Sequence, residues 1–157
     1  MTRVLFVCLG NICRSPTAEF VFRALAAREG LVTEVDSAGT GGWHAGEQAD
    51  PRTIDHARRR GYDLGPHRAR QVTAEDFETY DLVLAMDASN LSNLRKVCPP
   101  IRTQKLALFL DHAPATGRRE VPDPYTGGPE AFEEVLDLVE AASRGLISSL
   151  RSTPRVA

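Results

Sequence analysis

Cysteine is scarce in this sequence: only Cys8, Cys13 and Cys98 occur among 157 residues. An odd and small number of cysteines makes a poor disulfide framework. In a reducing compartment, such cysteines are catalytic, redox-sensing or simply buried. No group of cysteines and histidines has the spacing of a structural zinc site. We therefore expect neither a metal nor a disulfide scaffold.

Long hydrophobic runs and an excess of basic residues are also missing. The clean apolar run near the N-terminus covers only residues 4–7, which is too short for a signal-peptide core or a membrane span. The net charge is -2 at pH 7, whereas nucleic-acid binding normally requires a strongly basic surface. We expect a cytoplasmic protein without a nucleic-acid or membrane partner.

Length and composition suit a small globular protein. Hydrophobic residues make up 42% of the sequence and charged residues 25%, which are ordinary values for a soluble domain. No internal repeat, low-complexity block or linker divides the chain. We predict a single domain over residues 1–157 with one sizeable core, and a frayed tail after about residue 151.

Buried strands alternate with amphipathic helices along the chain. Continuous apolar runs indicate strands that are buried on both faces, as in a parallel sheet. The predicted strands span residues 4–7, 32–35, 82–86 and 106–110. Helical patterns follow each strand, over residues 15–29, 51–60 and 90–97 and from about 130 to 150. We predict an α/β fold with a four-stranded parallel sheet, helices on both faces and right-handed crossovers.

Local signals add detail to this prediction. Ser15 is a candidate cap and Pro16 a candidate first residue of the first helix, which should end at Gly30. Residues 36–43 read as a loop. Residues 58–60 are three consecutive arginines, which we interpret as a solvated helix end.

A segment with reactive and anion-binding side chains connects the first predicted strand to the first predicted helix: Cys8-Leu9-Gly10-Asn11-Ile12-Cys13-Arg14-Ser15. Parallel folds place ligands at such strand-to-helix turns. Gly10 and Asn11 tolerate left-handed backbone angles, so the loop can turn its amides inward as an anion nest. The N-terminus of the following helix also attracts anions. The motif predicts a phosphate-binding loop.

Within this loop, Cys8 is a candidate nucleophile. Helix N-termini and nearby cations favour the thiolate, which is a strong nucleophile. The planar fork of Arg14 can hold two phosphoryl oxygens, and the Ser15 hydroxyl can donate to the Cys8 sulfur. The spacing of Cys8 and Arg14 alone would also fit a buried packing cysteine, but the flanking strand and the Gly-Asn pair favour catalysis.

Asp123 is a candidate proton donor in the long loop before the last helix. Pro124 restricts the backbone at Asp123 to extended forms. Placed beside Cys8, the carboxyl group can act as a general acid and then as a general base. Taken alone, an Asp-Pro pair is more often a turn.

The chain resembles the low-molecular-weight protein tyrosine phosphatases from residue 4 to about residue 150. Four separated segments carry this resemblance. They are residues 8–15, Asp36-Ser37-Ala38-Gly39 with Trp43, residues 67–71, and Asp123-Pro124-Tyr125. The resemblance implies hydrolysis of phosphotyrosine and small aryl phosphates through a cysteinyl-phosphate intermediate, without a cofactor. It implies Cys8 as nucleophile, Arg14 as phosphate clamp and Asp123 as general acid.

The resemblance also implies supporting residues. Leu9, Gly10, Ile12, Cys13 and Ser15 belong to the phosphate loop. A hydrogen-bond network of Asn11, Ser37 and His67 would keep that loop in shape.

Other residues concern specificity and regulation. Trp43 and Tyr125 would form the walls of the substrate slot; core packing of Trp43 and a merely exposed Tyr125 are the alternatives. Ile12 matches the tyrosine-specific branch, because phosphoarginine-specific relatives carry Thr there. Thr126 stands where some members have a second tyrosine. Cys13 would form a reversible disulfide with Cys8.

Two other functions fit the same loop. An arsenate reductase would need further downstream cysteines, but only Cys98 follows, and we interpret it as structural. A non-catalytic phosphate-binding module would not need the complete set of Cys8, Arg14 and Asp123. The expected partners are phosphotyrosine proteins or peptides, inorganic phosphate and other oxyanions. We expect a monomer or a weak homo-oligomer.

Overall fold

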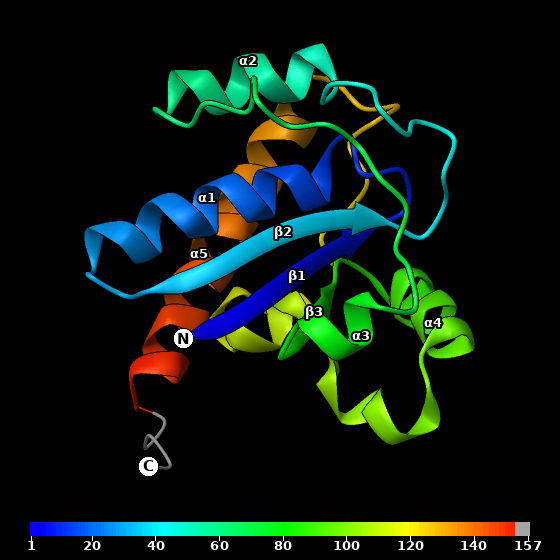
Figure 1. Cartoon of the computed structure of the whole chain (residues 1–157). Coiled ribbons are helices and arrows are strands. Elements are labelled where there is room, and N and C mark those ends of the chain that lie inside the picture. Colours follow the sequence, from blue (N-terminus) through cyan, green and yellow to red (C-terminus); the bar gives the residue numbers. More distant parts are fainter. Residues whose placement is uncertain (153–157) are drawn as a thin grey trace.

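The computed structural model describes residues 1–152. Four strands form one parallel sheet in the order β2-β1-β3-β4 (Figure 1). They are β1 (Thr2–Cys8), β2 (Thr33–Gly39), β3 (Leu82–Ala85) and β4 (Leu106–Leu108). Because β1 pairs with both β2 and β3, it lies inside the sheet and residues 4–7 are completely buried. The predicted four-stranded parallel sheet is confirmed.

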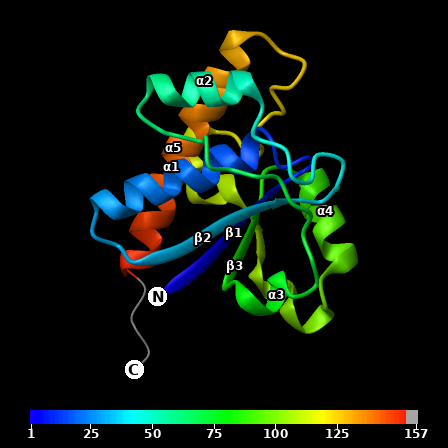
Figure 2. The same cartoon turned by 45° about the horizontal axis from the view of Figure 1, so that its top comes forward.

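Helices cover both faces of the sheet, as predicted. The α-helices are α1 (Arg14–Arg28), α2 (Pro51–Arg59), α3 (Asp76–Thr79), α4 (Ala88–Val97) and α5 (Pro129–Ser152). Short 3₁₀ helices span Pro100–Lys105, Phe109–His112 and Pro114–Thr116. In Figures 1 and 2, α1 and α5 lie on one face of the sheet, and α3 and α4 lie on the other. Each face therefore has its own layer of helices.

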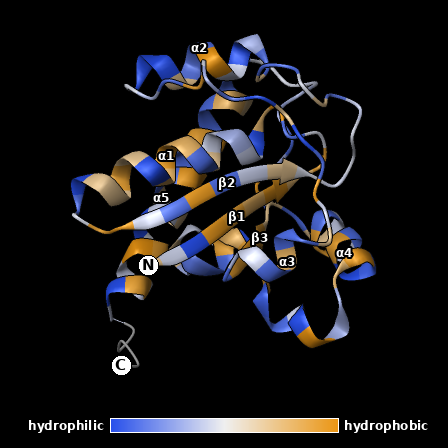
Figure 3. Cartoon of the chain, in the orientation of Figure 1, coloured by the Kyte–Doolittle hydropathy of each residue, from blue (hydrophilic) through white to orange (hydrophobic). Residues whose placement is uncertain are grey.

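Two hydrophobic cores explain the continuous apolar run of β1. Val4 and Phe6 pack in the core beneath α1 and α5, whereas Leu5 and Val7 pack in the core beneath α3 and α4. Successive side chains of a strand point to opposite faces, so both faces of β1 must be apolar. Figure 3 shows β1 as a mainly hydrophobic ribbon inside the sheet.

The second strand extends further than the sequence predicted. Residues 36–39 were expected in a loop but continue β2, because they pair with residues 5–8 of β1. Pairing with a buried neighbour outweighs the weak strand propensity of Asp, Ser and Gly. In contrast, β4 ends at Leu108, because the chain turns into a 3₁₀ helix at Phe109.

The start of α1 also differs from the prediction. The helix begins at Arg14 with Cys13 at the cap position, and no side chain caps it. Ser15 and Pro16 are therefore its second and third residues, where proline is tolerated because first-turn amides lack intrahelical partners. The Ser15 hydroxyl lies against Cys8 instead of capping the helix. The predicted end is confirmed, since Gly30 has φ of 69° just after the helix.

The three consecutive arginines do not form a simple solvated helix end. Arg60 contacts three carboxylates of α5: Glu133 at 2.8 Å, Asp137 at 2.9 Å and Glu140 at 2.5 Å. Only residues 58 and 59 are exposed. Arg60 therefore connects the C-terminal end of α2 to α5 through ion pairs. The prediction missed these ion pairs because they form only when α5 packs next to α2.

The remaining expectations concern the C-terminus and membranes. Residues 151–152 continue α5, and the rest of the predicted frayed tail lies outside the described residues. In the described part of the chain, no helix combines the length and apolarity needed to cross a membrane.

Candidate active site

The loop between β1 and α1 lies at the carboxyl edge of the sheet (Figure 1). Asn11 has φ of 58°, in the left-handed region. Gly10, the other residue expected to allow such angles, does not use them. A side chain at Gly10 would instead crowd His44, whose Cδ2 lies 3.1 Å from the position of a Cβ. Gly10 is needed for space and Asn11 for the turn.

Three hydrogen bonds hold the buried Asn11 side chain. Its Nδ2 donates to Ser15 Oγ at 2.8 Å and to Ser37 Oγ at 3.0 Å. Its Oδ1 accepts from the backbone N–H of Arg70 at 2.9 Å. The left-handed conformation is costly for most residues, and these bonds compensate that cost. The structure thus joins residues of three distant segments around the turn.

Glu19 completes this network, although the sequence analysis did not single it out. Ser37 Oγ donates to Glu19 Oε1 at 2.7 Å, and His67 Nδ1 lies 3.8 Å from the same oxygen. The Nε2 atom of His67 bonds to the carbonyl oxygen of Asn11 at 2.8 Å. The structure therefore brings the predicted residues Asn11, Ser37 and His67 together. A charged residue on the buried face of the first helix was the available signal for Glu19.

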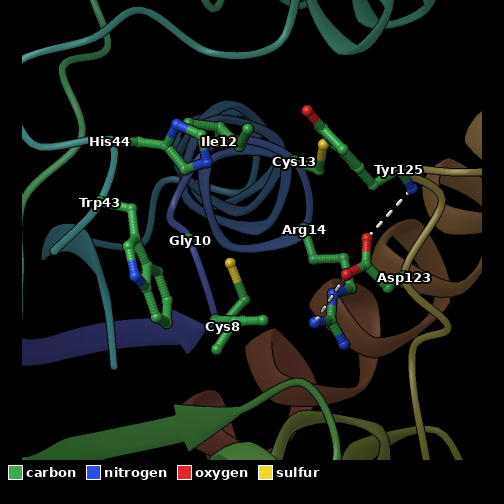
Figure 4. Close-up of a pocket in the computed structure, with 10 residues that line it drawn as sticks. Cys8, Gly10, Ile12, Cys13, Arg14, Trp43, His44, Asp123 and Tyr125 are labelled. Atoms are coloured by element: carbon green, nitrogen blue, oxygen red, sulfur yellow. Dashed lines mark hydrogen bonds and ion pairs between the residues drawn. The ribbon is translucent and has the colours of Figure 1, made fainter. Parts of the chain in front are cut away.

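Cys8 lies at the base of a pocket, with its Sγ 2.9 Å from Ser15 Oγ (Figure 4). Ser15 Oγ accepts a hydrogen bond from Asn11, so its own hydrogen can point to the sulfur at 2.9 Å; the carbonyl oxygen of Ala38, a second acceptor, is farther away at 3.4 Å. A hydroxyl that donates to a sulfur stabilises the thiolate over the thiol. The Ser15 hydroxyl is therefore placed as a potential hydrogen-bond donor to the Cys8 sulfur.

Arg14 is almost fully buried and held by two partners. Its Nη1 donates to Asp87 Oδ2 at 2.6 Å and to the carbonyl oxygen of Val121 at 3.0 Å. Burial opposes the positive charge, but Cys8, Asp87 and Asp123 outweigh it and raise the pKa of Arg14. The guanidinium therefore remains charged within the pocket, where it can balance an anionic ligand.

Asp87 is another residue that the sequence analysis missed. It caps α4, since its Oδ1 accepts from the backbone N–H of Asn90 at 2.7 Å. Its other oxygen holds Arg14. The available signal was its place directly after a predicted buried strand, at the edge of the sheet that also holds the Cys8 loop.

Asp123 reaches the pocket from the loop before α5. Its Oδ2 lies 3.7 Å from Arg14 Nη2, and its Oδ1 accepts from the backbone N–H of Tyr125 at 3.1 Å. About half of its side chain is exposed to solvent. Asp123 is therefore close to Arg14 and accessible to water, as a group that exchanges protons with solvent must be.

The pocket has a volume of about 220 Å³. Its lining joins the phosphate-loop segment to two other loops: Cys8, Leu9, Gly10, Ile12, Cys13, Arg14, Trp43, His44, Asp123 and Tyr125. In Figure 4, Cys8 lies between Trp43 on one side and Arg14 and Asp123 on the other. His44 was not predicted; Asn11, Ser15, Ser37 and His67 lie outside this lining and support the loop.

Trp43 and Tyr125 stand at the pocket as exposed aromatic side chains. Trp43 is 71% exposed and Tyr125 is 50% exposed, so core packing of Trp43 is wrong. The Trp43 ring lies against the backbone of Gly41, where a Cβ would be 1.8 Å from it. The guanidinium of Arg52 lies 5.5 Å from the centre of the Tyr125 ring. These contacts position both rings beside the entrance.

Cys13 also lines the pocket, and it is a free thiol like Cys8. Burial, together with the charges of Asp50, Cys8 and Asp123, raises the pKa of Cys13 to about 12. Cys13 therefore stays protonated at neutral pH. Cys98 is buried in the core beneath α4, away from the pocket lining, as its structural interpretation required.

Known proteins are similar to this chain in sequence and in fold. The family model described as low molecular weight phosphotyrosine protein phosphatase matches residues 3–155. A low molecular weight protein-tyrosine-phosphatase of Streptomyces coelicolor is 52% identical over 154 residues, which cover 95% of this chain and 93% of the relative. A crystal structure of a protein tyrosine phosphatase from Entamoeba histolytica, with Hepes in its active site, has a TM-score of 0.93 at 40% identity and covers 96% and 97% of the two chains.

A bacterial structure gives the same result. The crystal structure of YfkJ from Bacillus subtilis has a TM-score of 0.92 at 41% identity, and the match covers 99% of this chain and 98% of that one. Sequence and fold thus agree along nearly the whole chain. The chain belongs to the low molecular weight protein-tyrosine-phosphatase family, whose members are phosphoric monoester hydrolases.

Proposed function

We propose that this protein hydrolyses phosphotyrosine in proteins or peptides, and small aryl phosphates, with Cys8 as the nucleophile. One observation carries the proposal. Cys8 Sγ, with the Ser15 hydroxyl 2.9 Å away, shares one pocket with the charged Arg14 and with Asp123. Nucleophile, anion clamp and proton donor are therefore available to a single phosphoryl group.

In the first step, the Cys8 thiolate attacks phosphorus while the bond from phosphorus to the phenolic oxygen breaks. The backbone amides of the phosphate loop and the guanidinium of Arg14 hold the phosphoryl oxygens and stabilise their charge. Asp123 gives its proton to the leaving phenolic oxygen. The products are the free phenol and a cysteinyl-phosphate, the intermediate that is general to this family.

In the second step, water attacks the phosphorus of the cysteinyl-phosphate. Asp123, now ionised, takes a proton from the water, and the sulfur–phosphorus bond breaks. Inorganic phosphate leaves and the Cys8 thiolate is restored. The charge on sulfur is again stabilised by the Ser15 hydroxyl and by Arg14. No metal or organic cofactor enters these steps.

The pocket walls favour an aromatic ester. A phenyl ring fits between Trp43 and Tyr125, and such stacking is worth about 0.5–1.5 kcal/mol beyond the area that it buries. The shorter side chain of phosphoserine would bring its phosphate to Cys8 only by drawing the peptide backbone into the slot. Ile12 in the lining is consistent with phosphotyrosine, an oxygen ester, rather than phosphoarginine, in which nitrogen carries the phosphoryl group.

Cys13 has a proposed protective role. Peroxide oxidises the Cys8 thiolate to a sulfenic acid, and the Cys13 sulfur then attacks it, which releases water and forms a disulfide. A thiol reductant would then reduce the disulfide and restore the thiols of Cys8 and Cys13. The free Cys13 thiol in the same pocket as Cys8 supports this proposal.

The test compares phosphate release from matched phosphotyrosine and phosphoserine peptides, with wild-type protein and Cys8→Ser. We expect release from the phosphotyrosine peptide alone and none with Cys8→Ser, which should still bind vanadate or phosphate. Turnover by Cys8→Ser would contradict the nucleophile assignment. Equal rates on the two peptides would contradict the specificity. Arsenate reduction, the rival function, gains no support because Cys98 lies outside the pocket.

A further inference from the structure

A second hollow lies beside the catalytic pocket and shares two of its lining residues, Leu9 and Trp43. It has a volume of about 350 Å³. Asn93, Lys96 and Val97 at the end of α4 form its other side. Figure 2 shows α4 next to the segment that follows β2, which carries Trp43. The hollow therefore continues the catalytic pocket across the Trp43 ring.

Trp43 lines both hollows and packs against the loop that carries it. Its ring lies so close to the Gly41 backbone that a Cβ there would be 1.8 Å from it. One side of the indole is thus available to the catalytic pocket and another to the second hollow. Leu9 is 41% exposed and Val97 is 55% exposed, so the second hollow presents exposed apolar side chains besides Trp43. Large exposed apolar side chains that gather at one place mark a binding surface.

Among the described residues that line the second hollow, Lys96 alone is charged. Lys96 is exposed, and its side chain makes no ion pair or hydrogen bond within residues 1–152. None of the side chains that line the hollow is acidic. Arg95, its neighbour on α4, is also exposed but does not line the hollow. The surface therefore complements a ligand that carries both an apolar group and a carboxylate.

The ligand follows from continuity with the catalytic pocket. When a phosphotyrosine ring lies on one side of Trp43, the flanking residues of an extended peptide continue at about 3.3 Å each. The residues one to three positions away on one flank then lie over the second hollow. They are the part of a protein substrate that a small aryl phosphate lacks.

We propose that the second hollow binds residues that flank the phosphotyrosine of a protein substrate, with an apolar side chain against Trp43 and Val97 and an acidic one beside Lys96. This inference rests on the proposed hydrolysis of phosphotyrosine. It assigns sequence preference to Lys96 and Val97, which do not line the catalytic pocket.

The experiment measures kcat/KM for phosphate release from ten-residue phosphotyrosine peptides. Each peptide carries Leu with Asp, Leu with Lys, or Ser with Asp, on the N-terminal or the C-terminal flank. The enzymes are wild type, Lys96→Glu, Val97→Ser and the matched control Arg95→Glu. Turnover of 4-nitrophenyl phosphate, which is too small to reach the hollow, is the reference for each enzyme.

On one flank, we expect wild type to prefer the Leu-Asp peptide over the Leu-Lys peptide about threefold to fivefold at low salt. Lys96→Glu should reverse that preference, whereas Arg95→Glu should keep it. Val97→Ser should reduce the preference for Leu over Ser. The proposal is overturned by equal rates for all peptides in wild type, or by an Arg95→Glu effect equal to that of Lys96→Glu. If either result appears while 4-nitrophenyl phosphate is still hydrolysed, only the binding role of the second hollow is wrong. If wild type does not hydrolyse 4-nitrophenyl phosphate at all, the proposed phosphatase function is wrong as well.

Discussion

Arg14 Nη1 donates to Asp87 Oδ2 across 2.6 Å, which joins the first turn of α1 to the first residue before α4. The two residues lie 73 positions apart in the sequence. A buried guanidinium has several rotamers, and a charged partner on a fixed helix cap selects one of them. Asp87 is therefore a positioning residue for the proposed phosphate clamp.

Asp87→Asn should lower kcat for 4-nitrophenyl phosphate about tenfold with little change in stability. Asn is a good helix cap and its oxygen keeps the bond to Asn90, but its NH2 group then faces Arg14 and offers neither a charge nor a hydrogen-bond acceptor. Steady-state kinetics and thermal unfolding separate the two effects. Unchanged kcat and phosphate affinity would show that Val121 alone positions Arg14, and a large fall in melting temperature would indicate a structural role.

Asp123→Asn should lower kcat/KM for phenyl phosphate about 100-fold and that for 4-nitrophenyl phosphate much less. Asn still accepts the Tyr125 N–H, so the loop is retained, but it has no proton to give. A good leaving group needs no such proton. The slope of log kcat/KM against the leaving-group pKa measures the difference, because kcat/KM excludes the hydrolysis of the common cysteinyl-phosphate. An equal loss of kcat/KM for all esters would argue against general acid catalysis.

Cys13→Ser should not recover from mild peroxide treatment as fully as wild type does. Without a neighbouring thiol, the oxidised Cys8 proceeds to acids that thiols do not reduce. The measurement is activity regained with dithiothreitol after graded peroxide exposure, with Cys98→Ser as the matched control. If Cys13→Ser recovers as well as Cys98→Ser, the protective role is wrong.

Alkaline pH should destabilise the protein in a way that depends on Cys13. Its folded pKa of about 12 lies above that of an unfolded thiol, about 8.5, because burial disfavours the thiolate. The stabilisation from the buried thiol is fully present below about pH 8.5 and is lost as the pH rises towards 12. Between these two pKa values the unfolded chain binds one proton fewer than the folded protein, so the free energy of unfolding falls by about 1.4 kcal/mol per pH unit.

Urea unfolding of wild type and Cys13→Ala at pH 8, 9 and 10 tests this expectation. The wild-type free energy of unfolding should fall more steeply with pH than that of the variant. Comparing slopes removes the constant cost of the cavity that the substitution creates. Parallel slopes would show that the Cys13 thiol ionises as readily in the native protein as in the unfolded chain.

Gly145→Ala should lower the free energy of unfolding by about 2 kcal/mol or more. Alanine normally stabilises a helix relative to glycine by about 0.8–1 kcal/mol. At Gly145, however, a Cβ would lie 1.7 Å from the carbonyl oxygen of His112, so α5 or the 3₁₀ helix Phe109–His112 must move. Ser148→Ala, on an exposed part of the same helix, is the control. A Gly145→Ala protein as stable as that control would contradict the close packing.

The phosphate loop and the first strand could be predicted because their signals are local. The apolar run at residues 4–7 places β1 inside a sheet, and the next few residues turn directly into a helix. Cys8, Asn11 and Arg14 are separated by only a few bonds of backbone, so a strand-loop-helix reading brings them together without knowledge of the rest. The alternation of strands and helices then determined the parallel sheet.

The family resemblance already indicated the distant residues Ser37, His67 and Asp123, but only the tertiary structure decided how they meet and which further residues complete the site. Strand order brings Asp87 to Arg14, and pairing with β1 extends β2 so that Ser37 reaches Asn11 and Glu19. The same arrangement places α4 beside Trp43. These contacts join residues far apart in the chain, whose local patterns indicate only a helix cap, a loop serine or an exposed lysine. Such neighbours are set by the order of the strands and the packing of helices on the whole sheet. No short segment of the sequence specifies that packing by itself.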